Sequence, residues 1–155
     1  KNKLCLCDWR YRKMRATIDN RIEKGLNAKL VAGNDAVIDM AIAQLEEYFE
    51  HNRKVFAVPL LLVGTEFQKT VWRGLIDIPF GDTLSYMELS EAITNRNSVR
   101  AVANANGANA ISIIIPCHRI IGSNGALVGY AGGLQAKQKF INMENDLFNF
   151  AISNA

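Results

Sequence analysis

The stretch ISIIIPCHR, residues 111–119, decides how this chain is interpreted. Its opening run is short, apolar and β-branched, a pattern that predicts a buried strand. Pro116 ends that strand directly before Cys117, His118 and Arg119. A thiol at the end of a buried strand, with a base and a cation beside it, is a candidate nucleophile.

Cys117 needs help to react, because a free thiol has a pKa of about 8.5 and is mostly protonated at neutral pH. His118 is the only nearby base. Neighbouring residues of an extended segment point to opposite sides, so we expect a water molecule to join the imidazole to the thiol. Glu144 faces the core on the last predicted helix and can orient His118 from behind. Each residue can equally have a structural role. His118 can be a partly buried histidine whose hydrogen bonds are satisfied, and Glu144 can be a helix residue at the edge of the apolar face.

The charge pattern around Cys117 is one-sided, although the net charge is only +3. No Asp or Glu occurs between Ala92 and Met143. This pattern predicts a local positive field that favours the thiolate and a basic surface that binds a polyanion. The alternative is that the stretch is an ordinary solvated surface that lacks acidic residues. The basic residues of the stretch are Arg96, Arg100, Arg119, Lys137 and Lys139.

Upstream of this stretch, capping signals predict three short helices. TEFQ at residues 65–68 is a capping box for a helix to Ile76, and SYME at residues 85–88 begins a second helix through about Ile93. Ser98 can cap a third helix that Gly107 ends in a left-handed conformation. Two short helices around a tight turn suggest a helix-turn-helix, although many such pairs bind nothing.

The fold class predicted is α/β (α+β), in two lobes. Residues 1–61 are expected to form a small, variable N-terminal lobe that contains a sheet and is incomplete at its start. Within it, Leu4–Trp9 is predicted as a strand, and Asn34 caps a helix from Asp35 to about His51. Residues 62–155 are expected to form a mostly helical lobe with the helix-turn-helix, the buried reactive-cysteine strand and a last helix from near Gly133 to about Phe150.

Composition excludes several classes of protein. The apolar stretches are far shorter than the roughly 20 residues that span a bilayer, and no signal segment opens the chain, so we expect a cytoplasmic protein without membrane contact. Three cysteines are too few for a disulfide framework and imply a reducing compartment. No metal is expected, because Cys5, Cys7 and His51 cannot complete a four-ligand site. No cofactor is expected, and the protein is expected to be a monomer.

IPCHRI at residues 115–120 closely resembles the active-site signature of the O6-alkylguanine-DNA alkyltransferases, also called methylated-DNA protein-cysteine methyltransferases. The likeness runs from Gly64 to Glu144, about half of the chain, and CDWR at residues 7–10 weakly resembles the family's N-terminal lobe. It implies direct DNA repair by irreversible, stoichiometric transfer of an alkyl group from O6-alkylguanine in double-stranded DNA to Cys117. Other matching motifs are GTEFQ at 64–68, SY at 85–86, RAV at 100–102, Asn109 and YAGGL at 130–134.

The resemblance assigns roles to the residues of the relay and of the DNA interface. Cys117 becomes the acceptor, His118 the water-linked base and Glu144 its orienting carboxylate. Arg100 becomes the finger that enters the minor groove and replaces the flipped base, and Tyr86 presses on the adjacent phosphate. The remaining DNA contacts are expected from Arg96 and Arg119.

The resemblance also implies a pocket for the flipped guanine. It places Tyr130 near a ring nitrogen, the Ala131 amide near O6, and the carbonyls of Cys117 and Ile120 at the exocyclic amine. Ser112 and Val128 correspond to pocket walls that vary among relatives. Asn109 corresponds to a structural hinge between the recognition helix and the active-site strand.

Three other functions remain open. A helix-turn-helix regulator would bind DNA without chemistry and keep Cys117 as a core thiol. A cysteine hydrolase would use Cys117 and His118 repeatedly, although their adjacency argues against it. A non-reactive alkyltransferase-like sensor would lack the nucleophile that this sequence retains.

Overall fold

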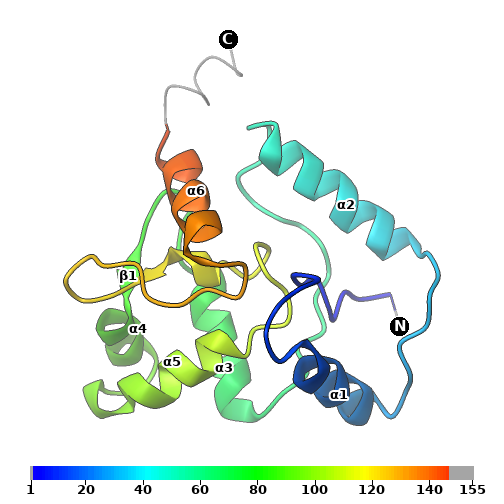
Figure 1. Ribbon diagram of the computed structural model, residues 1–155, viewed down its shortest axis with the longest axis horizontal. Helices are drawn as coiled ribbons and strands as arrows, with labels where there is room; N and C mark the ends of the chain where they lie inside the picture. The colour runs from blue at the N-terminus through cyan, green and yellow to red at the C-terminus, as the bar shows by residue number, and fades with distance from the viewer. Residues whose placement is uncertain (1, 147–155) are drawn as a thin grey trace.

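The structure, a computed structural model that describes residues 2–146, contains six α-helices, two 3-10 helices and one sheet of two short parallel strands (Figure 1). Leu84 lies opposite Ile120 in the sheet, and Ser85 opposite Ile121. The mixed α/β class predicted from the sequence is confirmed. The elements are α1 (Arg15–Leu26), α2 (Ala36–Phe49), α3 (Glu66–Ile76), β1 (Leu84–Ser85), α4 (Tyr86–Ile93), η1 (Arg96–Ser98), α5 (Val99–Gly107), η2 (Cys117–Arg119), β2 (Ile120–Ile121) and α6 (Leu134–Asn145).

Both predicted capping boxes form. The Thr65 hydroxyl accepts from the Gln68 amide at 3.1 Å while the Gln68 side chain accepts from the Thr65 amide at 3.0 Å. Ser85 and Glu88 make the same reciprocal pair at the start of α4. Each box satisfies amides that have no partner inside the helix, so these starts are determined by four adjacent residues.

The helices α3, α4 and α5 pack around one apolar core in the lower part of Figure 1. Val71, Leu75, Leu89 and Val102 are at most 1% exposed there. The indole of Trp72 ties the helices together, because its Nε1 donates to the Ala105 carbonyl at 2.9 Å. This packing fixes the direction of α5 relative to the rest of the lobe.

The sheet lies elsewhere than predicted. In residues 2–146 the N-terminal segment makes only isolated bridges, Leu4 with Leu60 and Cys7 with Ile111. The Cys7 amide donates to the Ala110 carbonyl at 2.9 Å, and the Ser112 amide donates to the Cys7 carbonyl at 2.7 Å. The N-terminal segment therefore pairs with the segment before Cys117 instead of forming a sheet of its own. The boundary at residue 61 stays a prediction.

The run before Cys117 is buried, as predicted, but it is not a strand. It turns back on itself at Ile113, which has a φ of 72°. The reason is Asn109, whose carboxamide accepts from the Ile111 amide at 2.9 Å and donates to the Ile115 carbonyl at 3.0 Å. The Asn109 side chain thus makes the hydrogen bonds to the backbone of this run that a neighbouring strand would otherwise make.

Four helix ends differ from expectation. Ser98 precedes α5, but its side chain makes no capping hydrogen bond. Asp35, not Asn34, caps α2 by accepting from the Val37 amide. Gly107 is the last residue of α5 and has no positive φ. The helix α6 ends at Asn145, and the predicted continuation to Phe150 lies outside the described residues.

None of the helices within residues 2–146 combines the length and the apolarity that crossing a membrane requires.

Candidate active site

Cys117 begins η2, in the connection between the Ile113 turn and β2. Its side chain borders a cavity of about 1040 Å³, although the residue is only 5% exposed. A pocket of this size admits a flat heterocycle. Cys117 therefore lies at the wall of the cavity, although almost all of its surface is buried. Other residues that line the cavity are Tyr86, Asn109, Gly129, Tyr130, Ala131 and Gly133.

The Cys117 thiol is protonated at rest. Burial raises its pKa, and the hydrogen bond from Asn109 Nδ2 at 3.2 Å, with the charges of Arg12 and Lys137, offsets this only in part. Lys137 of the basic stretch does lower the pKa of Cys117, as expected, but desolvation disfavours the charged form more strongly and the pKa rises. A base must take the proton when the sulfur reacts.

The structure brings His118 and Glu144 together, as predicted. Nε2 of His118 lies 2.7 Å from Glu144 Oε2, and His118 is 0% exposed. Burial lowers the pKa of His118, against the opposite effect of Glu144, so the imidazole is neutral. A neutral imidazole that donates from Nε2 to a carboxylate carries its lone pair on Nδ1. In the described part of the chain, Nδ1 has no hydrogen-bond partner and is available as the base.

Glu144 is the centre of this buried cluster. Arg119 Nε donates to Glu144 Oε1 at 2.6 Å, and the Tyr48 hydroxyl donates to Oε2 at 3.0 Å. Burial alone would raise the pKa of Glu144, but the hydrogen bonds from His118 and Arg119 outweigh it and lower the pKa to about 2. The Glu144 carboxylate is thus charged at neutral pH, where the His118 imidazole is neutral.

Two basic residues of the acid-free stretch lie inside the protein. Arg119 is 7% exposed and also donates from Nη1 to the Ile78 carbonyl at 2.7 Å, so the expectation that it contacts DNA is wrong. Lys137 is 0% exposed and holds the loop before α6 through the carbonyls of Val128 and Gly129. Both cations donate hydrogen bonds to oxygen atoms inside the protein. The distribution of charges along the sequence does not reveal these contacts.

The other predicted DNA contacts lie at the surface. Arg100 is exposed in the first turn of α5, and Arg96 on η1 is exposed but forms an ion pair with Glu91 at 2.9 Å. Tyr86 begins α4, borders the Cys117 cavity and donates from its hydroxyl to the Val128 carbonyl at 3.2 Å. The helix α4 therefore reaches the cavity with its first residue, whereas α5 lines it with its C-terminal half and Arg100 lies outside the lining.

Two of the predicted pocket residues line the cavity, Tyr130 and Ala131. The Tyr130 ring packs edge-on against Trp9 with centroids 6.0 Å apart. The same indole lies so close to Gly132 that a Cβ there would collide with it, which explains the glycine. The loop wall of the pocket is thus fixed from the N-terminal segment.

Two predicted wall residues are not at the wall. Ser112 is buried and turns its hydroxyl to Asp8 Oδ1 at 3.3 Å, and the Val128 side chain is 51% exposed. Neither lines the cavity, because the N-terminal segment engages Ser112 and the carbonyl of Val128 faces inward instead of its side chain. Ile120 is 0% exposed in β2, and its amide donates to the Cys117 carbonyl.

Sequence reasoning missed two arginines that bind the backbone at the end of α5. Arg12 donates to the Asn109 carbonyl at 2.7 Å, donates to the Gly107 carbonyl, and pairs with Asp8 at 3.2 Å. Arg21 donates to the Ala108 carbonyl at 2.8 Å. Guanidinium groups at the end of α5 satisfy carbonyls that the helix leaves free. The only signal was the concentration of charge in residues 10–29, which predicted no partner.

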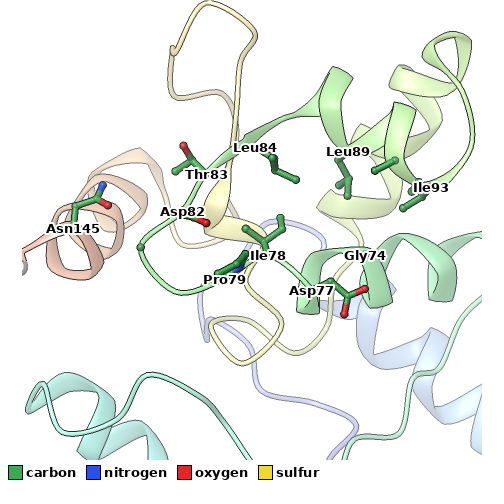
Figure 2. Close-up of a pocket in the computed structure, with 12 residues that line it drawn as sticks. Gly74, Asp77, Ile78, Pro79, Asp82, Thr83, Leu84, Leu89, Ile93 and Asn145 are labelled. Atoms are coloured by element: carbon green, nitrogen blue, oxygen red, sulfur yellow. The ribbon is translucent and has the colours of Figure 1, made fainter.

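A separate cavity of about 610 Å³ lies between the end of α3, the second half of α4 and the end of α6 (Figure 2). Its lining combines Ile78, Pro79 and Leu89 with the carboxylates of Asp77 and Asp82. None of the predicted site residues lines it. Within residues 2–146, no group of three or more His, Cys, Asp or Glu residues is placed to hold a metal ion.

Comparison with known proteins finds relatives that match the part of the chain containing Cys117, His118 and Glu144. The model of the 6-O-methylguanine DNA methyltransferase DNA-binding domain matches residues 66–146. The methylated-DNA–protein-cysteine methyltransferase of Methanosarcina mazei is 50% identical over 103 residues, 66% of this chain and 65% of that protein. The inducible enzyme of that name from Bacillus subtilis is 40% identical over 121 residues, 78% of this chain and 68% of that protein.

Among solved structures, Mycobacterium tuberculosis OGT in complex with DNA superposes with a TM-score of 0.69 at 41% identity, over 75% of this chain and 71% of that chain. The chain covers less than two thirds of the M. mazei relative. The matched region 66–146 nevertheless exceeds half of the 155 residues and contains Cys117, His118 and Glu144. The chain therefore belongs to the O6-methylguanine-DNA methyltransferase family.

Proposed function

We propose that this protein repairs DNA directly, by moving the alkyl group of an O6-alkylguanine onto Cys117. The observation that carries the proposal is the geometry around the sulfur. Cys117 borders a cavity large enough for a purine, and next to it His118 is neutral, oriented by Glu144 at 2.7 Å and unpaired at Nδ1. This is the arrangement by which a general base activates a nucleophile.

The reaction balances without a cofactor. The Cys117 proton passes through a bridging water to His118 Nδ1, and the sulfur attacks the alkyl carbon in line. The S–C bond forms as the C–O6 bond breaks, the electron pair stays on guanine, and His118 returns the proton to a ring nitrogen through solvent. The products are guanine and S-alkylcysteine, so one molecule repairs one lesion.

The base would be recognised by Tyr130, Ala131 and Cys117, which line the cavity, and by Ile120, which does not line it. Tyr130 lies near a ring nitrogen, the Ala131 amide donates to O6, and the carbonyls of Cys117 and Ile120 accept from the exocyclic amine. A donor at O6 stabilises the charge that develops on the leaving guanine and so lowers the barrier. The position of Tyr130 and Ala131 on the cavity wall supports this assignment.

The lesion would reach the cavity by base flipping from the minor groove. Extruding a base costs a few kcal/mol, which a side chain inserted into the vacated stack offsets. Arg100 supports this role because it is exposed in the first turn of α5. Tyr86 is the first residue of α4 and lines the cavity, which supports its role of pressing on the phosphate beside the flipped base.

Replacement of Arg100 by alanine is expected to slow repair of duplex DNA at least tenfold more than reaction with the free base, because only the duplex needs the base extruded. The slope of log affinity against log salt should also fall by about 0.9. Arg73→Ala, which removes an exposed arginine on α3, is the matched control and should change neither quantity. If Arg100→Ala slowed repair of the duplex and reaction with the free base equally, Arg100 would not be the finger that replaces the flipped base.

Transfer itself is tested by counting products. With O6-methylguanine duplex in excess, every chain should gain one methyl group and the reaction should then stop. A helix-turn-helix regulator would bind the duplex without gaining mass. A cysteine hydrolase would consume substrate continuously and leave the protein mass unchanged. Intact-protein mass spectrometry over time separates the three.

A further inference from the structure

The hydroxyl of Tyr48 reaches the relay from the other half of the chain. Tyr48 lies near the end of α2, the helix at the upper right of Figure 1, and is 0% exposed. Its hydroxyl donates to Glu144 Oε2 at 3.0 Å. The same oxygen contacts His118 Nε2 at 2.7 Å. The phenol and the imidazole therefore share one carboxylate oxygen.

The surroundings of Tyr48 hold this donor in place. Its ring contacts the rings of Phe56, Phe80 and Phe140, with centroids 5.4, 6.4 and 6.4 Å away. Burial, reinforced by the charge of Glu144, raises the pKa of Tyr48 far above its usual range. The phenol thus keeps its proton and cannot act as an acid or base in the reaction. Its only polar role is to donate to the carboxylate.

We propose that Tyr48 is a positioning residue of the transfer relay, which sets the orientation of Glu144 and limits how strongly Oε2 holds the imidazolium form of His118. The inference rests on the proposed function of the same site. A carboxylate oxygen that accepts a second hydrogen bond is a weaker acceptor for the first. His118 then stays neutral to lower pH and remains able to accept the Cys117 proton.

The other charged and titratable groups around the pair are accounted for. Arg119 on η2 donates to both oxygens of Glu144, and its charge lowers the pKa of His118. Lys137 on α6 acts in the same direction, and Glu144 acts against both. Tyr130 presents its ring edge-on to His118, 6.5 Å away. Removal of the Tyr48 donor leaves all of these in place and strengthens the hold of Oε2 on its remaining donors, of which His118 is the closest at 2.7 Å and Arg119 lies at 3.2 Å.

The test is Tyr48→Phe, which removes the hydroxyl and leaves the ring. The chain has two histidines, His51 and His118, so imidazole NMR signals can be titrated individually in the intact protein without DNA. We expect the midpoint of His118 to rise by about half a unit to one unit. The His51 amide donates to the Tyr48 carbonyl, so the amide signal of His51 reports any displacement of the helix end.

The pH dependence of the rate of alkyl transfer is the second measurement. Below the His118 midpoint, the variant should react up to about tenfold more slowly than the parent, and above about pH 8 the two rates should converge. DNA affinity should not change, since Tyr48 is buried. A merely structural contribution of Tyr48 would lower stability and leave the pH profile unmoved.

Phe49→Leu is the control for packing. Phe49 contacts the Tyr48 ring, with centroids 5.5 Å apart, but has no polar group. It should lower stability without moving the His118 midpoint or the pH profile. A Tyr48→Phe protein with the parent midpoint and pH profile would overturn the inference. Absence of alkyl transfer in the parent chain would refute the proposed function instead, and the titration would still show whether Tyr48 controls His118.

Discussion

A Cys117→Ala variant is expected to transfer no alkyl group while binding alkylated duplex as tightly as the parent chain. The reason is that covalent transfer requires the sulfur, whereas affinity comes from phosphate contacts at the surface. Truncation of a 5% exposed thiol removes little volume and should cost only about 1 kcal/mol of stability. DNA affinity by fluorescence anisotropy and methyl uptake by protein mass are the two measurements.

The two other cysteines provide controls. Cys7 is a poor nucleophile, because burial and the neighbouring Asp8 charge raise its pKa to about 11. Cys5 also has a pKa raised by burial, and neither residue lines the Cys117 cavity. Cys5→Ala and Cys7→Ala should therefore retain full uptake of one methyl group. Uptake by the Cys117→Ala protein at the parent rate would mean that another atom is the acceptor.

Glu144→Gln is expected to cost about 3 to 5 kcal/mol of stability and to slow transfer about a hundredfold or more. The carboxamide keeps the shape of the side chain but not its charge, so buried Arg119 loses its ion pair and His118 loses the group that orients it. Urea unfolding measures the first effect and single-turnover transfer the second. Glu46→Gln, an exposed change on α2, is the matched control and should alter neither.

The same variant should flatten the acid dependence of stability. The pKa of Glu144 falls from an ordinary 4.5 to about 2 on folding, so its contribution is complete above pH 4.5 and is lost as the pH falls towards 2. At about 1.4 kcal/mol per unit, this contribution is about 3 kcal/mol. Burial lowers the pKa of His118 below 6.5, so protonation of the unfolded chain adds a loss of stability below that value. An unchanged acid dependence in Glu144→Gln would contradict the central place of this carboxylate.

Local signals were enough to predict part of the structure. The capping boxes at Thr65 and Ser85 involve residues three apart, and both helices begin where those residues require. Glu144 was placed towards the core by helical spacing, and its contact with His118 follows from that face. Structural features that depend on residues close in sequence, or on the periodicity of one helix, can be predicted without knowledge of the tertiary fold.

Contacts between distant segments could not be predicted in this way. The apolar run at residues 111–115 has the composition of a strand, but Asn109 bonds to its backbone and turns it back. Arg119 resembles a surface cation in the sequence and is in fact paired to Glu144, 25 residues away. Tyr48 fits the apolar face of its helix, and nothing in that pattern shows where its hydroxyl points. In each case tertiary contacts override the local pattern.

The position of the transferred group tests the account most directly. After reaction with an O6-methylguanine duplex, digestion and peptide mapping should find one added methylene unit on the peptide that contains Cys117 and none on the peptides that contain Cys5 or Cys7. A methyl group on any other residue, or an unmodified Cys117 after the lesion has disappeared, would contradict it.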